Sequence, residues 1–174
     1  MGKIIGGGFP VGAIAGRSDI MQVLDPSKSK LLLPYSGTFS ANPITMTAGK
    51  IAMQLYTEDA VQKLNTLSQE AIIQIRDAIK IADVPISITG AGSMFRLHLR
   101  EKPPTNYREA YQPKESTQIM CELLDYMFLK ENIMMINTGA CMLSTVMTNK
   151  EVERLSEALL NGFRIIKPKL EMIK

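Results

Sequence analysis

The sequence predicts an α/β protein whose C-terminal part has α+β architecture, with a short sheet covered by helices. Two observations support this fold class. From residue 57 onward the hydrophobic pattern gives the order helix, two strands, helix, two strands, helix. Before residue 57 it gives a glycine-rich loop, helices and a single strand, which has no second strand to pair with. We therefore expect two parts, residues 1–56 and 57–174, of which the second is the better folded.

Glycines are dense near the start of the chain, where Lys3 is followed by the run Gly6-Gly7-Gly8. Glycine tolerates positive φ and lets another group approach the backbone closely, so such a run suits a loop that holds a flat or anionic group. A lysine beside that loop can donate to a phosphate or form a Schiff base with a carbonyl. A lysine near a chain terminus is more often simply solvated. A P-loop does not fit, because its lysine follows the glycines and precedes Ser or Thr.

The rest of the first part consists of short elements. Residues 10–16 are small and apolar, which favours a short buried strand, and Ser18-Asp19 can cap a helix over residues 20–24. The apolar run Leu31–Leu33 needs cover, which a partner subunit could supply.

A longer helix is expected to begin at Asn42-Pro43. Asn is a favourable N-cap, and Pro is well tolerated at the first helical position. The helix should run to about Tyr56. Its inner face should consist of Ile44, Ala48, Ile51, Ala52 and Leu55.

In the second part, Thr57 caps a long helix whose apolar period continues to Asp83. The later elements are strands over 86–89 and 94–99, a helix over 116–131, short strands over 133–136 and 142–147, and a last helix opened by the capping box of Thr148 and Glu151. We expect His98 on a polar, partly exposed strand face, and Cys121 as a packed, reduced thiol.

The composition excludes several classes of protein. The net charge of +3 is small, the basic residues are spread along the chain and Trp is absent, so nucleic-acid binding is not expected. No apolar run approaches the ~20 residues that cross a membrane. The two cysteines do not have the spacing of a metal site. His98 is the only histidine, so a histidine-based metal cluster cannot form, and a serine triad would have no second histidine to choose from. Reduced cysteines favour a cytoplasmic protein.

Two motifs together resemble a known family. They are Gly-Lys-x-Ile-Gly-Gly-Gly-x-x-x-Gly-Ala over residues 2–13 and Ser-Gly-Thr-Phe-x-x-Asn-Pro over residues 36–43. Further agreement lies at residues 89–95 and 143–152. The chain resembles the class III aminotransferases of fold type I, which depend on pyridoxal 5'-phosphate. Its closest resemblance is to the branch of glutamate-1-semialdehyde 2,1-aminomutase and the β-amino-acid aminotransferases.

The resemblance implies roles for individual residues. Lys3 would be the catalytic lysine that carries pyridoxal 5'-phosphate as an aldimine, and Gly37 and Thr38 would bind the cofactor phosphate of the neighbouring subunit in a homodimer. The substrate would be a small amino acid or keto acid, with transaminase and aminomutase both open. Residues 1–56 would be a remnant of the large cofactor-binding domain. Residues 57–174 would be the linking helix and the small C-terminal domain.

The sequence also departs from the family pattern. Only two residues precede Lys3, so the carboxylate that pairs with the pyridine nitrogen, the stacking ring and the phosphate cup are missing. We therefore expect a C-terminal fragment that is inactive by itself. The stretch 137–146 contains no arginine to hold a substrate carboxylate, which leaves the substrate open. The alternative interpretation is a non-catalytic α+β interaction module, in which Lys3 is an ordinary terminal residue.

Overall fold

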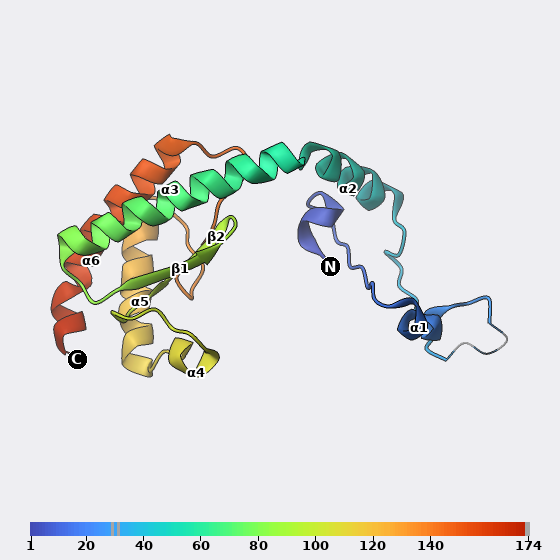
Figure 1. The fold of residues 1–174 in the computed structure, drawn as a ribbon, viewed down its shortest axis with the longest axis horizontal. Coiled ribbons are helices and arrows are strands. Elements are labelled where there is room, and N and C mark those ends of the chain that lie inside the picture. The colour runs from blue at the N-terminus through green and yellow to red at the C-terminus, as the bar shows by residue number, and fades with distance from the viewer. Residues whose placement is uncertain (29, 31, 173–174) are drawn as a thin grey trace. The chain divides into compact units, whose positions relative to one another are not determined.

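The computed structural model describes residues 1–28, 30 and 32–172. The chain consists of two compact units, Met1–Ala60 and Val61–Lys174, which we call unit 1 and unit 2 (Figure 1). Leu31, part of the apolar run expected to need cover, lies outside the described residues. The mixture of helices and a small sheet agrees with the predicted fold class. Among the described residues no helix is both long and apolar enough to cross a membrane.

Unit 1 is almost entirely helical or irregular. Its elements are η1 (Lys3–Gly6), α1 (Ser18–Met21), η2 (Gln22–Leu24) and α2 (Pro43–Leu55). The strand expected over residues 10–16 is not formed, and the prediction was wrong. This segment makes only an isolated antiparallel bridge between Gly2 and Gly12. The reason is physical, because a strand needs a neighbouring strand and the described part of unit 1 offers none.

Helix α2 begins as predicted but faces the other way. The Asn42 Oδ1 accepts hydrogen bonds from the N–H groups of Ile44 at 3.1 Å and Thr45 at 3.2 Å, which confirms the N-cap. Thr45 and Gly49 are the buried residues of this helix. The apolar residues expected on the inner face are largely exposed, at 62% for Ile44, 52% for Ile51 and 74% for Leu55.

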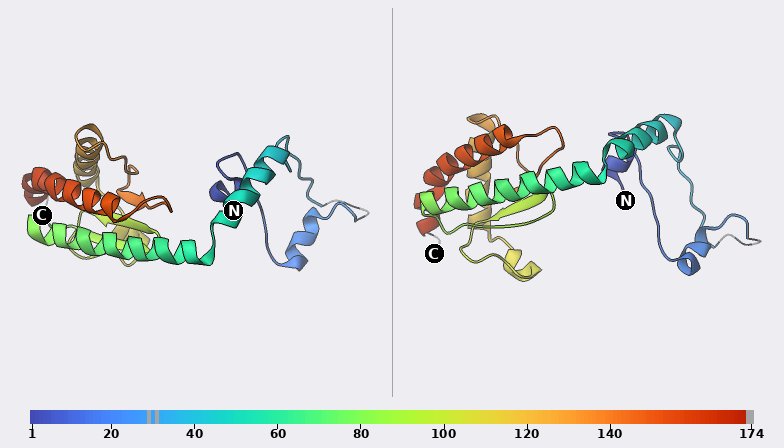
Figure 2. Two further views of the ribbon diagram at one scale, coloured as in Figure 1. Left: turned by 90° about the horizontal axis from the view of Figure 1, so that it is seen from above. Right: turned by 45° about the horizontal axis from the view of Figure 1, so that its top comes forward.

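Unit 2 is an α+β domain with an antiparallel sheet in the order β1-β2-β3 (Figure 2). The strands are β1 (Ser87–Ala91), β2 (Met94–His98) and β3 (Ala140–Met142), and the helices are α3 (Glu58–Ala82, which starts in unit 1), α4 (Tyr107–Ala110), α5 (Lys114–Leu129) and α6 (Asn149–Met172). Residue Phe95 of β2 pairs with Gly90 on one side and Cys141 on the other. The strands expected over 133–136 and 142–147 are replaced by β3 alone, with residues 133–136 irregular.

The core of unit 2 lies between its sheet and its long helices. Both views of Figure 2 show α3 and α6 side by side. The fully buried side chains include Ile75, Leu97, Met120, Leu123, Met127, Leu159 and Phe163. The capping box of α6 is confirmed, because Glu151 Oε2 accepts from the N–H and the hydroxyl of Thr148, each at 2.7 Å.

Two polar or sulfur-bearing side chains of unit 2 lie differently from the prediction. His98 is buried, at 4% exposure, and residues 109–113 of the segment that follows β2 line the same cavity as His98. Cys121 is exposed, because α5 turns its Met120 and Leu123 toward the core and leaves Cys121 on the solvent side.

Candidate functional site

Lys3 occupies the first position of η1 in a strained backbone conformation. Its φ is 58°, in the left-handed region that residues with a Cβ rarely adopt. For such a residue this conformation costs about 1–2 kcal/mol. The Lys3 side chain is exposed, and no ion pair in the described part of the chain engages it. The strain at Lys3 must therefore be held in place by the packing around it.

That packing comes from a main-chain contact between η1 and α2. A Cβ built on Gly49 would lie 2.1 Å from the Ile5 carbonyl oxygen, and one built on Gly7 would lie 2.4 Å from the Ala48 carbonyl oxygen. No side chain fits at either place. Gly7 also has a positive φ of 58°. The two elements therefore dock backbone against backbone, and this fixes the turn that carries Lys3.

The glycine run has two different roles in the structure. Gly6 and Gly7 are closely packed by protein atoms, since a Cβ on Gly6 would lie 2.5 Å from Val11 Cγ1. At Gly8 a Cβ would meet nothing within 4 Å, and this residue has a φ of +93°. Of the three glycines expected to leave room for a flat group, only Gly8 faces open space.

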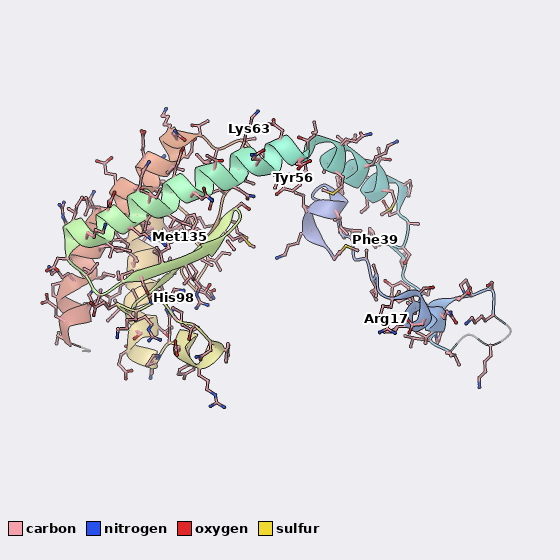
Figure 3. The ribbon with its side chains drawn as sticks, viewed as in Figure 1. Arg17, Phe39, Tyr56, Lys63, His98 and Met135 are labelled. Carbon is pink, nitrogen blue, oxygen red and sulfur yellow. The ribbon has the colours of Figure 1, made fainter. Side chains whose placement is uncertain are left out.

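Gly37 and Thr38 lie in an exposed turn directly before α2. The Gly37 carbonyl accepts from Ser40 N–H at 2.9 Å, and the Phe39 carbonyl accepts from Asn42 N–H at 3.2 Å. Figure 3 labels Phe39 in this turn. The Thr38 hydroxyl has no hydrogen-bond partner among the described residues, and no hydrogen bond joins Thr38 to Lys3. The same helix, α2, thus follows the Thr38 turn and supports the Lys3 turn.

The carboxylates near α1 and η2 are already engaged. Asp19 accepts from Arg17 Nη2 at 2.6 Å and from its Nε at 3.1 Å, and this pairing holds the pKa of Asp19 below its usual range. Figure 3 shows Arg17 on this segment. Asp25 accepts from the hydroxyl and the N–H of Ser27, which lowers its pKa as well. Within the described residues no group of three His, Cys, Asp or Glu side chains could hold a metal ion.

An arginine does reach the arginine-free stretch 137–146 in unit 2. Arg96 Nε on β2 donates to the Thr138 carbonyl at 3.1 Å. The contact holds the turn before β3, and Gly139 in that turn has a φ of +74°. Sequence spacing could not reveal this contact, because 42 positions separate the two residues.

Gly49 is the residue of unit 1 that sequence reasoning missed. A glycine inside a helix is about 1 kcal/mol less favourable than alanine, so its presence in the middle of α2 was a signal of close backbone approach. Its partner, the Ile5 carbonyl, could not be named from the sequence.

Known proteins resemble this chain in sequence and in fold. The family model for class-III aminotransferases matches residues 1–114. Glutamate-1-semialdehyde 2,1-aminomutase 2 of Oceanobacillus iheyensis is 30% identical, over 95% of this chain and 38% of its own length. The crystal structure of an omega-transaminase from Sphaerobacter thermophilus has a TM-score of 0.90 and 35% identity, over 95% of this chain and 38% of its own.

A solved structure described as a transaminase with PLP bound has a TM-score of 0.82 and 31% identity. It covers 97% of this chain and 38% of its own. This chain therefore spans less than two fifths of the length of these three relatives.

Proposed function

This chain belongs to the class III aminotransferase family, and on that premise we propose that it takes part in pyridoxal-phosphate-dependent amino-group transfer with Lys3 as the catalytic amine. The finer proposal is an activity like that of glutamate-1-semialdehyde 2,1-aminomutase, supported by relatives of that name at 30% and 38% identity. Transamination of a small amino acid or keto acid is the other form of the same chemistry.

The observation that carries the proposal is the strained backbone of Lys3. A φ of 58° favours glycine, yet the chain has a lysine there with its amine exposed. Strained residues held by rigid packing cluster at functional sites. Here the rigid packing is the main-chain contact between η1 and α2. Because a glycine would fit this position with less strain, the lysine side chain is the reason for the residue.

The residues present fit two groups of pyridoxal 5'-phosphate, its aldehyde and its phosphate. Lys3 Nζ is a primary amine that can bond covalently to an aldehyde carbon, and the open space at Gly8 lies in the turn that follows η1. Thr38 offers a hydroxyl that has no partner among the described residues, and Gly37 and Thr38 offer main-chain N–H groups at an exposed turn, which are good phosphate donors. When bound, the cofactor supplies an electron sink for the substrate carbanion.

The chain's own contribution is to hold the amine and to move a proton. As a free amine, Lys3 Nζ would be the group that takes a proton from the substrate carbon and returns it. Thr38 and Gly37 would fix the phosphate, either in the same chain or across a dimer. Asp19 and Asp25 are engaged by Arg17 and Ser27, so we propose neither as the partner of the pyridine nitrogen.

Self-association as a homodimer is part of the proposal. Unit 1 leaves many large apolar side chains in solvent, among them Leu32 at 64%, Leu33 at 54% and Phe39 at 61% exposure. Exposed apolar surface of this kind is typical of interfaces. A cytoplasmic location stays a prediction.

Borohydride trapping tests the role of Lys3. The chain is incubated with excess pyridoxal 5'-phosphate, reduced and mapped by peptide mass spectrometry, with Lys50, an exposed lysine of α2, as the internal comparison. We expect the label on Lys3 to exceed that on Lys50, and Lys3→Arg to remove it while keeping the charge. Equal labelling of both lysines would reject Lys3 as the catalytic amine and favour the non-catalytic module.

A further inference from the structure

A small cavity of about 230 Å³ lies in unit 2 where β2 ends. Its walls include His98 and Arg100 from the end of β2, Glu109 from α4, Gln112 from the connection that follows, and Ser116 from the first turn of α5. Figure 3 labels His98 at this end of the sheet, and Figure 1 shows α4 beside it. Polar and charged side chains thus line the cavity from three elements.

One wall of the cavity carries an amide without a partner. The Nε2 of Gln112 is buried and has no hydrogen-bond partner among the described residues. A buried donor left unpaired costs about 1–3 kcal/mol. Native proteins rarely leave such groups unsatisfied, so the amide is a donor that an acceptor in the cavity would satisfy.

Arg100 brings a guanidinium to the cavity wall, which also carries Glu109. Its Nη1 donates to the Glu109 carbonyl at 2.6 Å, and within the described residues no other hydrogen bond engages the five donors of the guanidinium. Burial lowers the pKa of His98, and the positive charges of Arg96 and Arg100 lower it further, so their field reaches the cavity wall.

The Glu109 carboxylate, the acidic group in the cavity lining, is hydrogen-bonded to Thr105 and Asn106. The Glu109 carboxylate accepts from Thr105 N–H at 2.9 Å, from the Thr105 hydroxyl at 3.1 Å and from Asn106 Nδ2 at 2.9 Å. These hydrogen bonds, those of Thr105 above all, lower the pKa of Glu109, and the positive charge of Arg100 lowers it further. Both carboxylate oxygens therefore accept from the 105–106 loop, and among the described residues no hydrogen bond joins them to Arg100.

The first turn of α5 adds further donors. The helix runs for 16 residues, and its N-cap, Pro113, provides no side-chain cap. The first N–H groups of an α-helix have no partner within the helix, and the positive end of the helix dipole favours an anion. Ser116, in that first turn, also lines the cavity and brings a hydroxyl.

We propose that this cavity binds a small oxyanion, a carboxylate or inorganic phosphate, through Arg100, the Gln112 amide and the first turn of α5. The volume is sufficient for a small ion. The buried amide of Gln112 requires a hydrogen-bond acceptor, and the positive charge of Arg100 favours an acceptor that is an anion. The site does not depend on Lys3 or on the proposed amino-group transfer.

NMR titration of the ¹⁵N-labelled full chain tests this site. Sodium phosphate and sodium acetate are added in separate experiments at constant ionic strength, with sodium chloride as the control. We expect saturable shifts of the Gln112 side-chain amide and of the Arg100 Nε–H with phosphate, with acetate or with both, and the effective ion identifies the ligand. Shifts that do not saturate, or that chloride reproduces, would mean an adventitious ion only and would overturn the proposal.

Variants give a second readout. Gln112→Leu removes the amide at similar size, and Gln69→Leu makes the same change at an exposed position of α3. We expect Gln112→Leu to weaken binding about tenfold or more, as for one lost hydrogen bond to a charged group. Gln69→Leu should leave the affinity unchanged. Equal affinity in both variants would remove Gln112 from the site, and the wild-type titration decides if Gln112→Leu fails to fold.

Discussion

The carbonyl oxygen of Ile5 lies where a side chain at Gly49 would begin, because a Cβ built on Gly49 is 2.1 Å from that oxygen. A contact of that length is impossible for any residue other than glycine. Glycine inside a helix is less favourable than alanine by about 1 kcal/mol, so the contact between η1 and α2 must stabilise unit 1 by more than this cost. What it secures is the position of η1 on α2, and η1 begins with Lys3.

We therefore predict that Gly49→Ala loosens unit 1. The added methyl group forces η1 from α2, at a cost of about 1–3 kcal/mol for overpacking, which outweighs the gain in helix propensity. Amide hydrogen exchange should accelerate in α2, whereas the α6 amides keep their protection. Gly12→Ala is the matched control, because a Cβ on Gly12 meets nothing within 4 Å. Unchanged exchange in Gly49→Ala would contradict the importance of this contact.

Lys3→Gly should stabilise unit 1 relative to Lys3→Ala. Both variants lose the amine, but only glycine removes the strain of a φ of 58°. The difference should be about 1 kcal/mol in favour of glycine. It can be measured from the exchange rates of the α2 amides in the two variants. Alanine and glycine variants of equal stability would show that the backbone at Lys3 is not strained, and the main support for the proposed function would be lost.

The sequence was sufficient for elements that local chemistry determines. Asn42 and Thr148 were identified as helix caps from residue type alone, and both make the expected hydrogen bonds. The strand predicted over residues 10–16 failed because strand formation depends on a partner that local pattern cannot supply. The prediction of which face of α2 is buried was wrong for a related reason. The apolar residues do recur at helical spacing, but the small residues Thr45 and Gly49 form the face that packs on η1.

The candidate site divides in the same way. Lys3 and Thr38 were identified through motifs, and the structure places both in turns associated with α2. The strain at Lys3 and the docking of Ile5 on Gly49 depend on tertiary contacts, which no spacing rule predicts. His98 was misplaced because alternation along β2 says which face it is on, but not that the chain after β2 covers that face.

Unit 2 should lose stability in acid through His98. Burial, with Arg96 and Arg100, sets the pKa of His98 below its ordinary value of 6.5 in the folded state. The unfolded chain therefore binds the proton more readily than the folded one. The stabilisation is complete above the unfolded pKa and is lost as pH falls through the folded pKa. Urea unfolding should be measured from neutral pH down through the folded-state pKa of His98. The free energy of unfolding should fall more for wild type than for His98→Gln.

Thr89→Val separates the effect of the Thr89–His98 hydrogen bond on stability from the effect of protonating His98. The Thr89 hydroxyl lies 2.8 Å from His98 Nε2, so its removal should cost about 1 kcal/mol at neutral pH. Because His98 remains buried, the fall in stability with acid should persist in this variant. An identical acid response in wild type and His98→Gln would show that other groups control it.

The last prediction concerns the exposed stripe of α2. Ile44, Ile51 and Leu55 recur at helical spacing, and all three are at least half exposed. A stripe of this kind is normally buried, and α2 presents its other face, with Thr45 and Gly49, to η1.

We therefore expect a second copy of the chain to cover this stripe, so that light scattering at tens of micromolar gives the mass of a dimer. Ile51→Glu places a charge in the centre of the stripe, and desolvating an unpaired carboxylate is costly, so this variant should be monomeric. Gln54→Glu adds the same charge on the same helix outside the stripe and should remain dimeric. A monomeric wild type would reject self-association. A dimer that persists in Ile51→Glu would place the interface elsewhere, for which the exposed Leu32 and Leu33 are the next residues to change.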